Sequence, residues 1–240
     1  PTTSALTLYW VTSRDRLADA KARVLARARE TDPAARWHPA VDKRLRLAVA
    51  MRGGVSLAVW IGGAVAELDL LRGIEVCRLG ETAVAFVAWP QPAPPPAPVR
   101  ERVRLYAQLL HDGGFSGVDC DVLAGASAGG LNSVMWATAQ RAGAPVDSML
   151  DTWREVGGLA ALMHPPGFRG VDALLQGDGY FWPQMRYALE RFHWSADAHP
   201  DRVAPHVSVD LSATLIDSAD ASDPDIREGR GDFHFSGRAS

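Results

Sequence analysis

The sequence predicts an α/β protein, because two apolar segments of strand type are each followed by a glycine-rich turn and then by a segment of helical type. In the first unit, residues 45–51 (LRLAVAM) precede the turn 52–56 (RGGVS) and the apolar residues 57–71. In the second unit, residues 118–123 precede a turn and residues 131–142. Short apolar runs bounded by turn residues are typical of buried strands, and longer runs are typical of helices. A chain of 240 residues with 47% hydrophobic residues is sufficient for one globular domain with a sizeable core.

The turn of the second unit contains GASAG at residues 125–129, which matches the G-x-S-x-G pattern of a nucleophile elbow. In such an elbow the strand-to-helix turn strains the backbone of the central serine, here Ser127, and Gly125 and Gly129 would relieve the crowding around it. The turn would also place Ser127 Oγ at a helix N-terminus, where backbone N–H groups stabilise developing negative charge. Small residues also occur between strands and helices for packing alone, so the pentapeptide by itself leaves both interpretations open.

The turn of the first unit places Gly53 and Gly54 between a strand and a helix, where backbone N–H groups stay approachable. Such a turn can bind phosphate or form an oxyanion hole. The turn has neither the G-K-[ST] ending of a P-loop nor a G-x-G-x-x-G pattern, which argues against a phosphate site. The nucleophile elbow later in the chain favours the oxyanion hole. The remaining alternative is a glycine pair that allows a helix and a strand to pack closely.

Together and in this order, the two motifs resemble those of the patatin-like phospholipase family. The resemblance is carried by AGASAGGLN at residues 124–132 and by MRGGVSLAVW at residues 51–60, which is similar to an actinobacterial-type, patatin-related subgroup. It extends approximately over residues 44–215. The resemblance implies a three-layer α/β/α sandwich with a mostly parallel central sheet. It also implies that Ser127 is the nucleophile, that the two glycines of the first turn form the oxyanion hole, and that an aspartate is the base of a Ser-Asp dyad, without a metal or a cofactor.

The first turn departs from the family pattern at three positions. The family's loop usually has three consecutive glycines, followed by a Lys or Arg and a final glycine. In this chain Arg52 stands at the first glycine, Ser56 at the basic residue and Leu57 at the last glycine. These differences bear on the affinity of the loop for anions and on its shape.

The base that the resemblance implies belongs to an Asp-Gly motif that comes well after the elbow. Asp112-Gly113 precedes Ser127, and Asp178-Gly179 follows it closely. Asp178 stands before a helical segment, where an aspartate that caps a helix or forms a turn is the stronger interpretation. The apolar run 207–216 is typical of the next strand of the family's sheet. We therefore expect the Asp-Gly motif beyond residue 240, and a domain that is incomplete at its C-terminus.

The sequence indicates an N-terminal extension, residues 1–43, followed by the patatin-like domain, residues 44–240. The extension contains a predicted basic helix over residues 14–30 with a thin, alanine-rich apolar face. A basic amphipathic helix can lie on anionic lipid, but the thin face favours a solvated or docking helix. The proline-rich residues 90–98 (PQPAPPPAP) are predicted to form an extended insertion on the surface of the larger domain.

The composition argues against several classes of protein. A net charge of −3 argues neither for nor against nucleic acid, but no basic-aromatic platform is present, and we expect no nucleic-acid partner. Cys77 and Cys120 form no C-x-x-C pair, which suits a reducing compartment. The apolar run 57–66 is too short to span a bilayer, and residues 1–11 lack the features of a signal peptide. We therefore expect a cytoplasmic protein, with peripheral membrane contact as an option.

The tryptophans and histidines leave alternatives open. Eight tryptophans fit either core packing or an apolar, membrane-facing rim, and residues 159–168 fit a loop or a lid. Five histidines follow Ser127, most of them in loops where a solvated side chain is the default, and no H-E-x-x-H pattern indicates a zinc site. Because histidine is the usual base of a catalytic serine, a Ser-His-Asp site remains open. Acyltransferase elbows usually have a histidine before the serine, and Ala126 stands there.

The motifs and the resemblance together favour a serine lipid acyl hydrolase that uses a Ser-Asp dyad and a glycine-rich oxyanion loop. Its substrate would be a lipid ester or a phospholipid, in the manner of a phospholipase A or of a lysophospholipase or esterase. The first alternative is an α/β-hydrolase or acyltransferase with a histidine base. The second is a catalytically inactive lipid-binding or regulatory module, which is suggested by Arg52 and by the missing aspartate.

Overall fold

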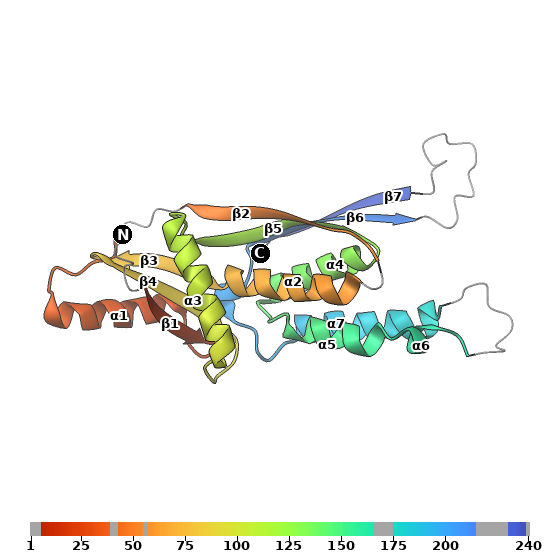
Figure 1. Ribbon diagram of the computed structural model, residues 1–240, viewed down its shortest axis with the longest axis horizontal. Coiled ribbons are helices and arrows are strands. Elements are labelled where there is room, and N and C mark those ends of the chain that lie inside the picture. The colour runs from red at the N-terminus through yellow and green to blue at the C-terminus, as the bar shows by residue number, and fades with distance from the viewer. Residues whose placement is uncertain (1–5, 39–42, 55–56, 166–174, 215–229, 239–240) are drawn as a thin grey trace.

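The chain has an α/β fold in the computed structural model, which describes residues 6–38, 43–54, 57–165, 175–214 and 230–238 (Figure 1). The described strands are β1 (Thr7–Thr12), β2 (Arg44–Met51), β3 (Ile74–Leu79), β4 (Thr82–Trp89), β5 (Gly117–Ala126), β6 (His206–Thr214) and β7 (Arg230–Arg238). The described α-helices are α1 (Leu17–Thr31), α2 (Leu57–Arg72), α3 (Ala97–Asp112), α4 (Ala128–Ala142), α5 (Asp147–Val156), α6 (Leu159–Leu162) and α7 (Trp182–His193). Two short helical turns are η1 (Gly177–Phe181) and η2 (Pro200–Arg202).

Both predicted strand–turn–helix units are present, as β2 followed by α2 and as β5 followed by α4. The predicted helix over residues 57–71 is confirmed, whereas α4 begins at Ala128 and not at residue 131. The sequence suggested a later start because Gly129 and Gly130 have a low helix propensity. In the structure both glycines are buried against neighbouring backbone, and this packing overrides the propensity.

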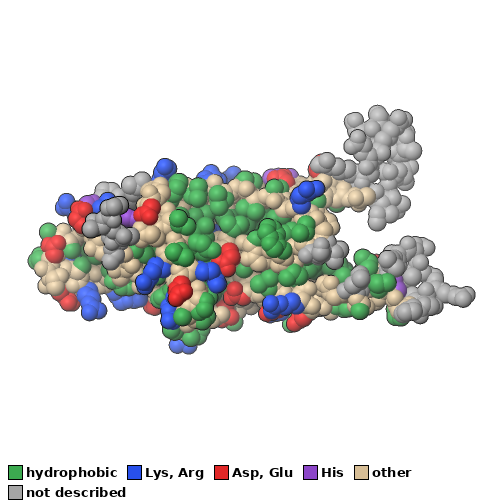
Figure 2. All heavy atoms as spheres, in the orientation of Figure 1, with side chains coloured by type: hydrophobic (Ala, Val, Ile, Leu, Met, Phe, Trp, Pro, Cys, Tyr) green, Lys and Arg blue, Asp and Glu red, His purple; other side chains and the backbone are tan. Residues whose placement is uncertain are grey.

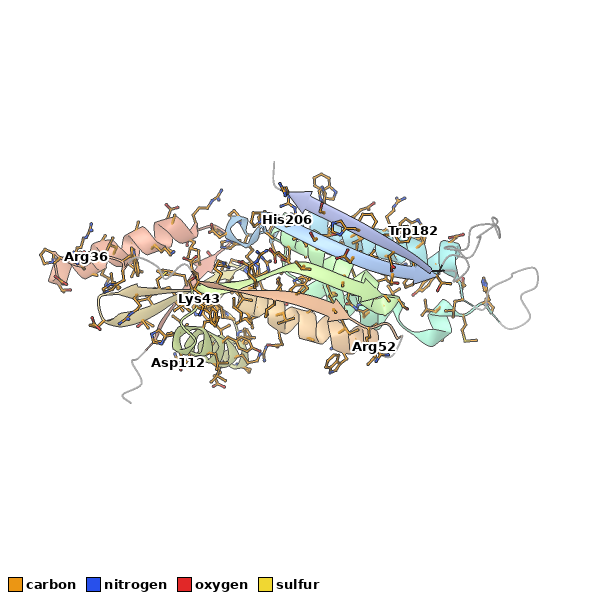
Figure 3. All side chains as sticks on the ribbon, turned by 90° about the horizontal axis from the view of Figure 1, so that it is seen from above. Arg36, Lys43, Arg52, Asp112, Trp182 and His206 are labelled. Carbon is orange, nitrogen blue, oxygen red and sulfur yellow. The ribbon has the colours of Figure 1, made fainter. Side chains whose placement is uncertain are left out.

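A four-stranded sheet has the order β2-β5-β6-β7. β2, β5 and β6 run parallel, and β7 pairs antiparallel with β6. Figure 3 shows Lys43 and Arg52 at the two ends of β2. In the register of the parallel strands, Met51 lies opposite Gly125, so β2 and β5 end side by side at the same edge of the sheet. The turns that follow these two strands therefore meet in space.

A second sheet has the order β1-β4-β3, in which β1 runs parallel to β4 and β3 runs antiparallel to it. The seven described strands are thus divided between two mixed sheets. β3 and β4 are joined by the pair Gly80-Glu81, with Gly80 at φ +57°. Such a short turn joins antiparallel strands, whereas a parallel crossover needs about a dozen residues. β1 belongs to the predicted N-terminal extension, yet it pairs with a strand of the larger segment.

Helices α2 and α4 cover one face of the four-stranded sheet, and α5 and α7 pack beneath them (Figure 1). The core between sheet and helices contains Leu123 and Val209 from the strands and Met135 and Trp136 from α4. Val122 is exposed on the opposite face of the sheet. Within the described part of the chain no helix covers that opposite face, so the described elements do not complete a three-layer sandwich.

The proline-rich insertion joins β4 to α3. Most of its residues are exposed, as expected of a surface segment. Its path is held at two points, because Trp89 Nε1 donates to the Ala93 carbonyl at 2.9 Å and Arg100 Nη1 donates to the Pro95 carbonyl at 2.9 Å. The insertion therefore turns back on β4 before α3 begins.

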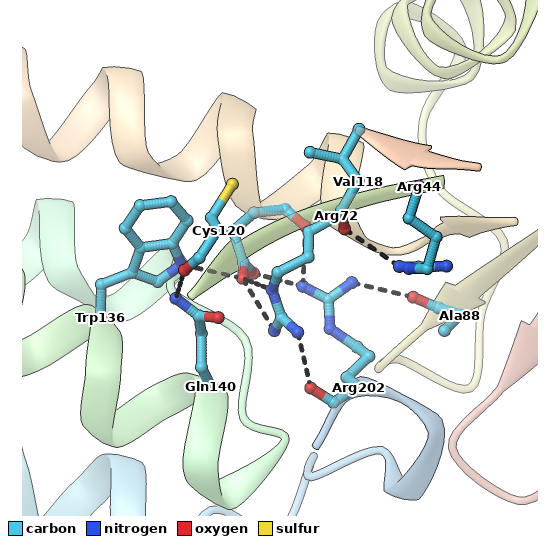
Figure 4. Close-up of polar contacts among 9 residues, drawn as sticks. Arg44, Arg72, Ala88, Val118, Cys120, Trp136, Gln140 and Arg202 are labelled. Carbon is cyan, nitrogen blue, oxygen red and sulfur yellow. Dashed lines mark hydrogen bonds and ion pairs between the residues drawn. The ribbon is translucent and has the colours of Figure 1, made fainter. Parts of the chain in front are cut away.

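A buried ionic network ties α2, α4 and η2 together (Figure 4). Asp69 accepts a hydrogen bond from Trp136 Nε1 at 3.1 Å and forms ion pairs with Arg72, at 3.2 Å, and with Arg202. Arg202 also donates to the Ala88 carbonyl at 3.1 Å, which connects the network to the second sheet. Burial by itself would raise the pKa of Asp69, but the Arg202 and Arg72 guanidinium groups hold it below its ordinary value. The carboxylate is therefore ionised and saturated with donors.

Candidate functional site

Ser127 occupies a strained turn between β5 and α4. Its backbone angles are φ 53° and ψ −128°, and it is the only non-glycine residue with positive φ among those that the structure describes. A non-glycine residue in such a region costs about 1–3 kcal/mol, and strain of this kind clusters at functional sites. The Ser127 side chain is exposed at the end of the sheet. The predicted strand–turn–helix context of the G-x-S-x-G motif is therefore confirmed.

Gly125 and Gly129 are required by close packing within the elbow. A Cβ atom on Gly129 would lie 2.1 Å from the Met51 carbonyl oxygen and 2.8 Å from that of Arg52. A Cβ atom on Gly125 would lie 2.5 Å from the Gly129 carbonyl carbon. Real side chains do not tolerate such distances to backbone atoms, which cannot move aside. The elbow can thus form against β2 only with glycine at both positions.

Gly53 brings the first turn into direct contact with the serine. A Cβ atom on Gly53 would lie 2.6 Å from Ser127 Cβ and 2.8 Å from the Ala126 carbonyl oxygen. Gly54 has φ +137°, a conformation that L-residues rarely adopt, and its carbonyl accepts the Leu57 N–H at 3.0 Å, which turns the chain into α2. The two motifs that the sequence separates are thus adjacent in space. Val55 and Ser56, the other residues of the predicted loop, lie outside the described residues.

Asn132 supports this arrangement, and sequence reasoning assigned no role to it. Its amide nitrogen donates to the Ala128 carbonyl at 2.9 Å and to the Ala58 carbonyl at 3.4 Å. Its amide oxygen accepts the Trp153 Nε1 hydrogen at 2.9 Å. One buried side chain therefore links the first turn of α4, the first turn of α2, and α5. The sequence feature that could have indicated Asn132 is its position, as a polar residue one turn after the elbow in a helix of small and apolar residues.

The candidate bases do not contact Ser127 within the described part of the chain, in which no hydrogen bond to Ser127 Oγ is present. Asp178 is exposed in the first turn of η1, which leads into α7. The cap residue of η1 is Gln176, without a side-chain cap hydrogen bond, so Asp178 lies in the first turn, where a carboxylate is favoured, and does not cap the helix. The Asp-Gly motif expected beyond residue 240 lies outside the described residues.

The histidines that follow the elbow make other contacts. The His193 ring packs edge-on against Trp194 at 4.5 Å. His206 Nε2 lies 3.1 Å from Ser208 Oγ, and His234 Nδ1 lies 2.7 Å from Asp210 Oδ1.

His199 is fully buried, and its two ring nitrogens have different roles. Its Nδ1 accepts the Asp201 N–H at 3.2 Å, and its Nε2 lies 3.1 Å from the Val11 carbonyl, to which a neutral ring with hydrogen on Nε2 donates. Burial lowers the pKa of His199, and this outweighs the Asp201 carboxylate, which raises it. His199 is thus a neutral structural residue that joins β1 to η2.

Neither cysteine is suited to be a nucleophile. Burial raises the pKa of the Cys120 thiol to about 12 and also raises that of Cys77, so neither forms an activated thiolate. The described residues contain no group of three or more His, Cys, Asp or Glu side chains placed to hold a metal ion. Ser127 is accordingly the candidate nucleophile of the described chain.

The tryptophans differ in burial. Trp89, Trp136 and Trp153 are buried, as the packing interpretation predicts, and Trp10 and Trp37 are partly buried. Trp60, Trp182 and Trp194 are exposed, so packing does not account for them. The predicted lid over residues 159–168 begins with α6 and is then held by a bridge between Met163 and Leu175, but its last residues, 166–168, lie outside the described residues.

None of the helices in the described part of the chain has the length and apolar content needed to cross a lipid bilayer.

Comparison with known proteins finds similarity to an uncharacterized membrane protein of Mycobacterium tuberculosis, Rv3479. The two sequences are 36% identical over 177 residues, which are 73% of this chain and 16% of the relative. The chain thus spans a small part of the relative's length. No known protein-family profile matches the chain, and no solved structure is significantly similar to it.

Proposed function

We propose that the chain carries the nucleophile and the oxyanion hole of a serine lipid acyl hydrolase with a patatin-like site. The observation that carries this proposal is the contact between the strained Ser127 and Gly53. A serine held at positive φ directly beside a glycine turn is the arrangement that acyl transfer requires. The nucleophile and the donors for its oxyanion must lie about 3 Å from one reacting carbonyl group.

The proposed reaction uses two steps. Ser127 Oγ attacks the acyl carbonyl carbon while its proton passes to a carboxylate base. The oxyanion is held by the N–H groups of Gly53 and Gly54, and by those at the start of α4. The protonated base then gives its proton to the leaving alcohol, and an acyl-serine remains. Water then gives a proton to the same base and attacks the acyl carbon, the bond between that carbon and Ser127 Oγ breaks, and the base returns the proton to Oγ as the fatty acid leaves.

The proposal assigns the base to an aspartate outside the described residues. Within those residues no carboxylate forms a hydrogen bond with Ser127, and four histidines that follow the elbow have other contacts, namely His193, His199, His206 and His234. An aspartate dyad needs no histidine, which agrees with this distribution. The parallel arrangement of β2, β5 and β6 with α2 and α4 on one face also supports a patatin-like three-layer sandwich. In that sandwich further helices would cover the exposed face around Val122.

The proposed substrate is a lipid ester or a phospholipid, cleaved as by a phospholipase A or by a lysophospholipase or esterase. The site is proposed to work without a metal or a cofactor and without a nucleic-acid partner. The name of the relative describes it as a membrane protein. This supports peripheral membrane contact for the present chain, which we place on the cytoplasmic side.

A fluorophosphonate probe tests the proposal, because it labels only activated serines. We expect labelling of the full-length protein that is absent in Ser127→Ala. Labelling should persist in the His164→Ala, His193→Ala, His199→Ala, His206→Ala and His234→Ala variants that remain folded. Loss of labelling in one folded histidine variant would favour a Ser-His-Asp site. Absence of labelling in the full-length wild type would contradict both enzyme mechanisms and favour a lipid-binding or regulatory module.

A further inference from the structure

The first turn of α2 exposes three large apolar side chains next to the candidate oxyanion hole. Leu57, Val59 and Trp60 are all exposed, Trp60 to 71%. A Cβ atom on Gly54 would lie 3.3 Å from Leu57 Cδ1, and Val59 and Trp60 belong to the same first turn of α2. Close packing therefore leads from Ser127 through the glycine turn to Leu57. A cluster of exposed apolar side chains beside a site indicates a surface that binds another molecule or a membrane.

Helix α3 extends this apolar surface. Leu105 and Leu109 are exposed to 63% and 68%, and their spacing of four residues places them on the same side of the helix. α3 is fixed to α2 through Glu67, which accepts a hydrogen bond from Tyr106 Oη at 2.7 Å and pairs with Arg102 at 3.3 Å. Figure 2 shows hydrophobic side chains gathered over α3 and α2 on one side of the molecule. We call the residues Arg52, Leu57, Val59, Trp60, Leu105 and Leu109 the α2–α3 face.

Arg52, at the edge of the α2–α3 face, is exposed and forms no ion pair within the described residues. On α3, Arg102 lies on the side of Leu109 and pairs with Glu67, and the exposed Glu101 lies beside Leu105, whereas Arg100 and Arg104 lie on the other side of the helix. Asp112, at the end of α3, lies 3.2 Å from His111. Figure 3 shows Arg52 at the end of β2, where the glycine turn begins. The Arg52 guanidinium group at the border of this apolar surface matches the phosphates above the acyl region of a phospholipid bilayer.

We propose that the α2–α3 face docks on the surface of an anionic phospholipid bilayer. Trp60 and the leucines would enter the interface between headgroups and acyl chains, as tryptophan prefers, and Arg52 would contact phosphates. Ser127 would then face the layer from which an acyl ester must be taken. This orientation rests on the proposed function, but the docking itself does not require turnover.

Sedimentation with sucrose-loaded vesicles tests the docking in the Ser127→Ala background, in which hydrolysis plays no part. The vesicles contain equal parts of phosphatidylcholine and phosphatidylglycerol, and vesicles of phosphatidylcholine alone are the comparison. We expect Trp60→Ala to weaken the partition into anionic vesicles by about tenfold, and the pair Leu105→Ser and Leu109→Ser by a similar factor. Arg52→Gln should weaken it by about fivefold, with a smaller dependence on salt.

Trp194→Ala is the matched control, because Trp194 is 78% exposed but lies at the end of α7. We expect it to bind vesicles as the parent does. Equal partition of the parent and Trp60→Ala, or equal losses in Trp60→Ala and Trp194→Ala, would overturn the proposal. It would also be overturned if ultracentrifugation showed a dimer that Trp60→Ala dissociates while vesicle binding stays unchanged, since the face would then join two copies of the chain. The probe labelling of Ser127 is scored separately, so a failed docking and a failed hydrolase proposal can be distinguished.

Discussion

Near the start of α2, the side chains of Ser127 and Arg52 are exposed and make no hydrogen bond or ion pair within the described residues, whereas near the end of the same helix Asp69 is buried and paired. Ser127 and Arg52 belong to the first region, and Ser127 is also strained. Asp69 belongs to the second, where it is held by Trp136 and two arginines. Both regions are anchored on α2 and α4, so the difference does not arise from the elements that form them.

The difference shows which polar groups serve the fold and which remain available for a ligand. A buried carboxylate without partners would be costly, and Asp69 offsets this cost through Trp136, Arg72 and Arg202. Ser127 and Arg52, near the start of α2, have no such pairing within the described residues, and the backbone of Ser127 is strained as well. A position that costs free energy without contributing to packing is one at which a function is expected.

The largest expected effect is at the nucleophile. Ser127→Ala should reduce ester hydrolysis by about 10³-fold or more, because the nucleophile itself is removed. Its free energy of unfolding should stay within about 0.5 kcal/mol of the wild type, since an exposed hydroxyl is lost. Hydrolysis of a soluble p-nitrophenyl ester and urea unfolding measure the two quantities. Full activity in Ser127→Ala would contradict the assignment of the nucleophile.

A substitution in the buried network should lower the free energy of unfolding, which the Ser127 substitution leaves nearly unchanged. Asp69→Ala leaves Arg72 and Arg202 buried without their carboxylate and should lower the free energy of unfolding by about 3–5 kcal/mol. Asp151→Asn is the matched surface variant, because Asp151 pairs with Arg154 at 3.4 Å in solvent, and its cost should be far smaller. Urea unfolding compares them. Equal stability of the two variants would show that the buried network does not stabilise the fold.

A substitution at Gly53 should affect both the rate of hydrolysis and the free energy of unfolding. A methyl group in Gly53→Ala would meet Ser127 Cβ at 2.6 Å. The displaced loop should lower the rate of hydrolysis by about 10²-fold, and the strain should lower stability by about 1–3 kcal/mol. Gly63→Ala, in the same region of the chain, is the control, because nothing lies within 4 Å of its added Cβ. That variant should gain about 0.5–1 kcal/mol, since alanine favours the helix interior. A Gly53→Ala protein with unchanged hydrolysis would separate the turn from the reaction.

The strain at the elbow can be measured directly. Ser127→Gly should be more stable than Ser127→Ala by about 1 kcal/mol, because glycine accepts φ 53° without a steric penalty. Both variants lack the hydroxyl, so their difference reports the backbone. Thermal and urea unfolding of the two proteins give the value. A more stable alanine variant would mean that the turn carries no strain.

The smallest effect concerns the pH dependence of stability. The pKa of His199 is lowered by burial, so the unfolded chain binds a proton at a higher pH than the folded chain does. Stability is therefore complete above the unfolded value of about 6.5 and is lost as the pH falls toward the folded value. His199→Gln should show a shallower loss between about pH 7 and pH 5. Unfolding curves across this range test it, and identical slopes for both proteins would exclude His199 as the cause.

Much of the candidate site could be predicted from the sequence because it depends on local patterns. The strand-like residues 118–123, the small residues around Ser127 and the apolar residues after them specify a strand, a tight turn and a helix within one continuous segment. The glycine turn at Gly53 follows the same logic. The role of Asn132 was not predicted, because its two carbonyl partners and its one indole partner are brought together only by the packed structure.

The parts that could not be predicted depend on contacts between distant segments. The apolar sequence of α2 predicts a buried helix, yet Trp60 is exposed, because only one side of the helix is covered by α4 and α5. The pairing of β1 with β4 joins strands far apart in the chain, and no local pattern indicates it.

The sequence by itself determined that this protein contains two strand–turn–helix units, and that one of them presents a serine among small residues. Hydrophobic periodicity and glycine spacing are local properties, and they specify strands, turns and helices within one continuous segment. Only the tertiary structure decided that Gly53 lies against Ser127, that Asp69 is saturated by donors from two other elements, and that Trp60 faces outward. Strand register and helix packing set those neighbours, and both depend on the free energy of the whole core.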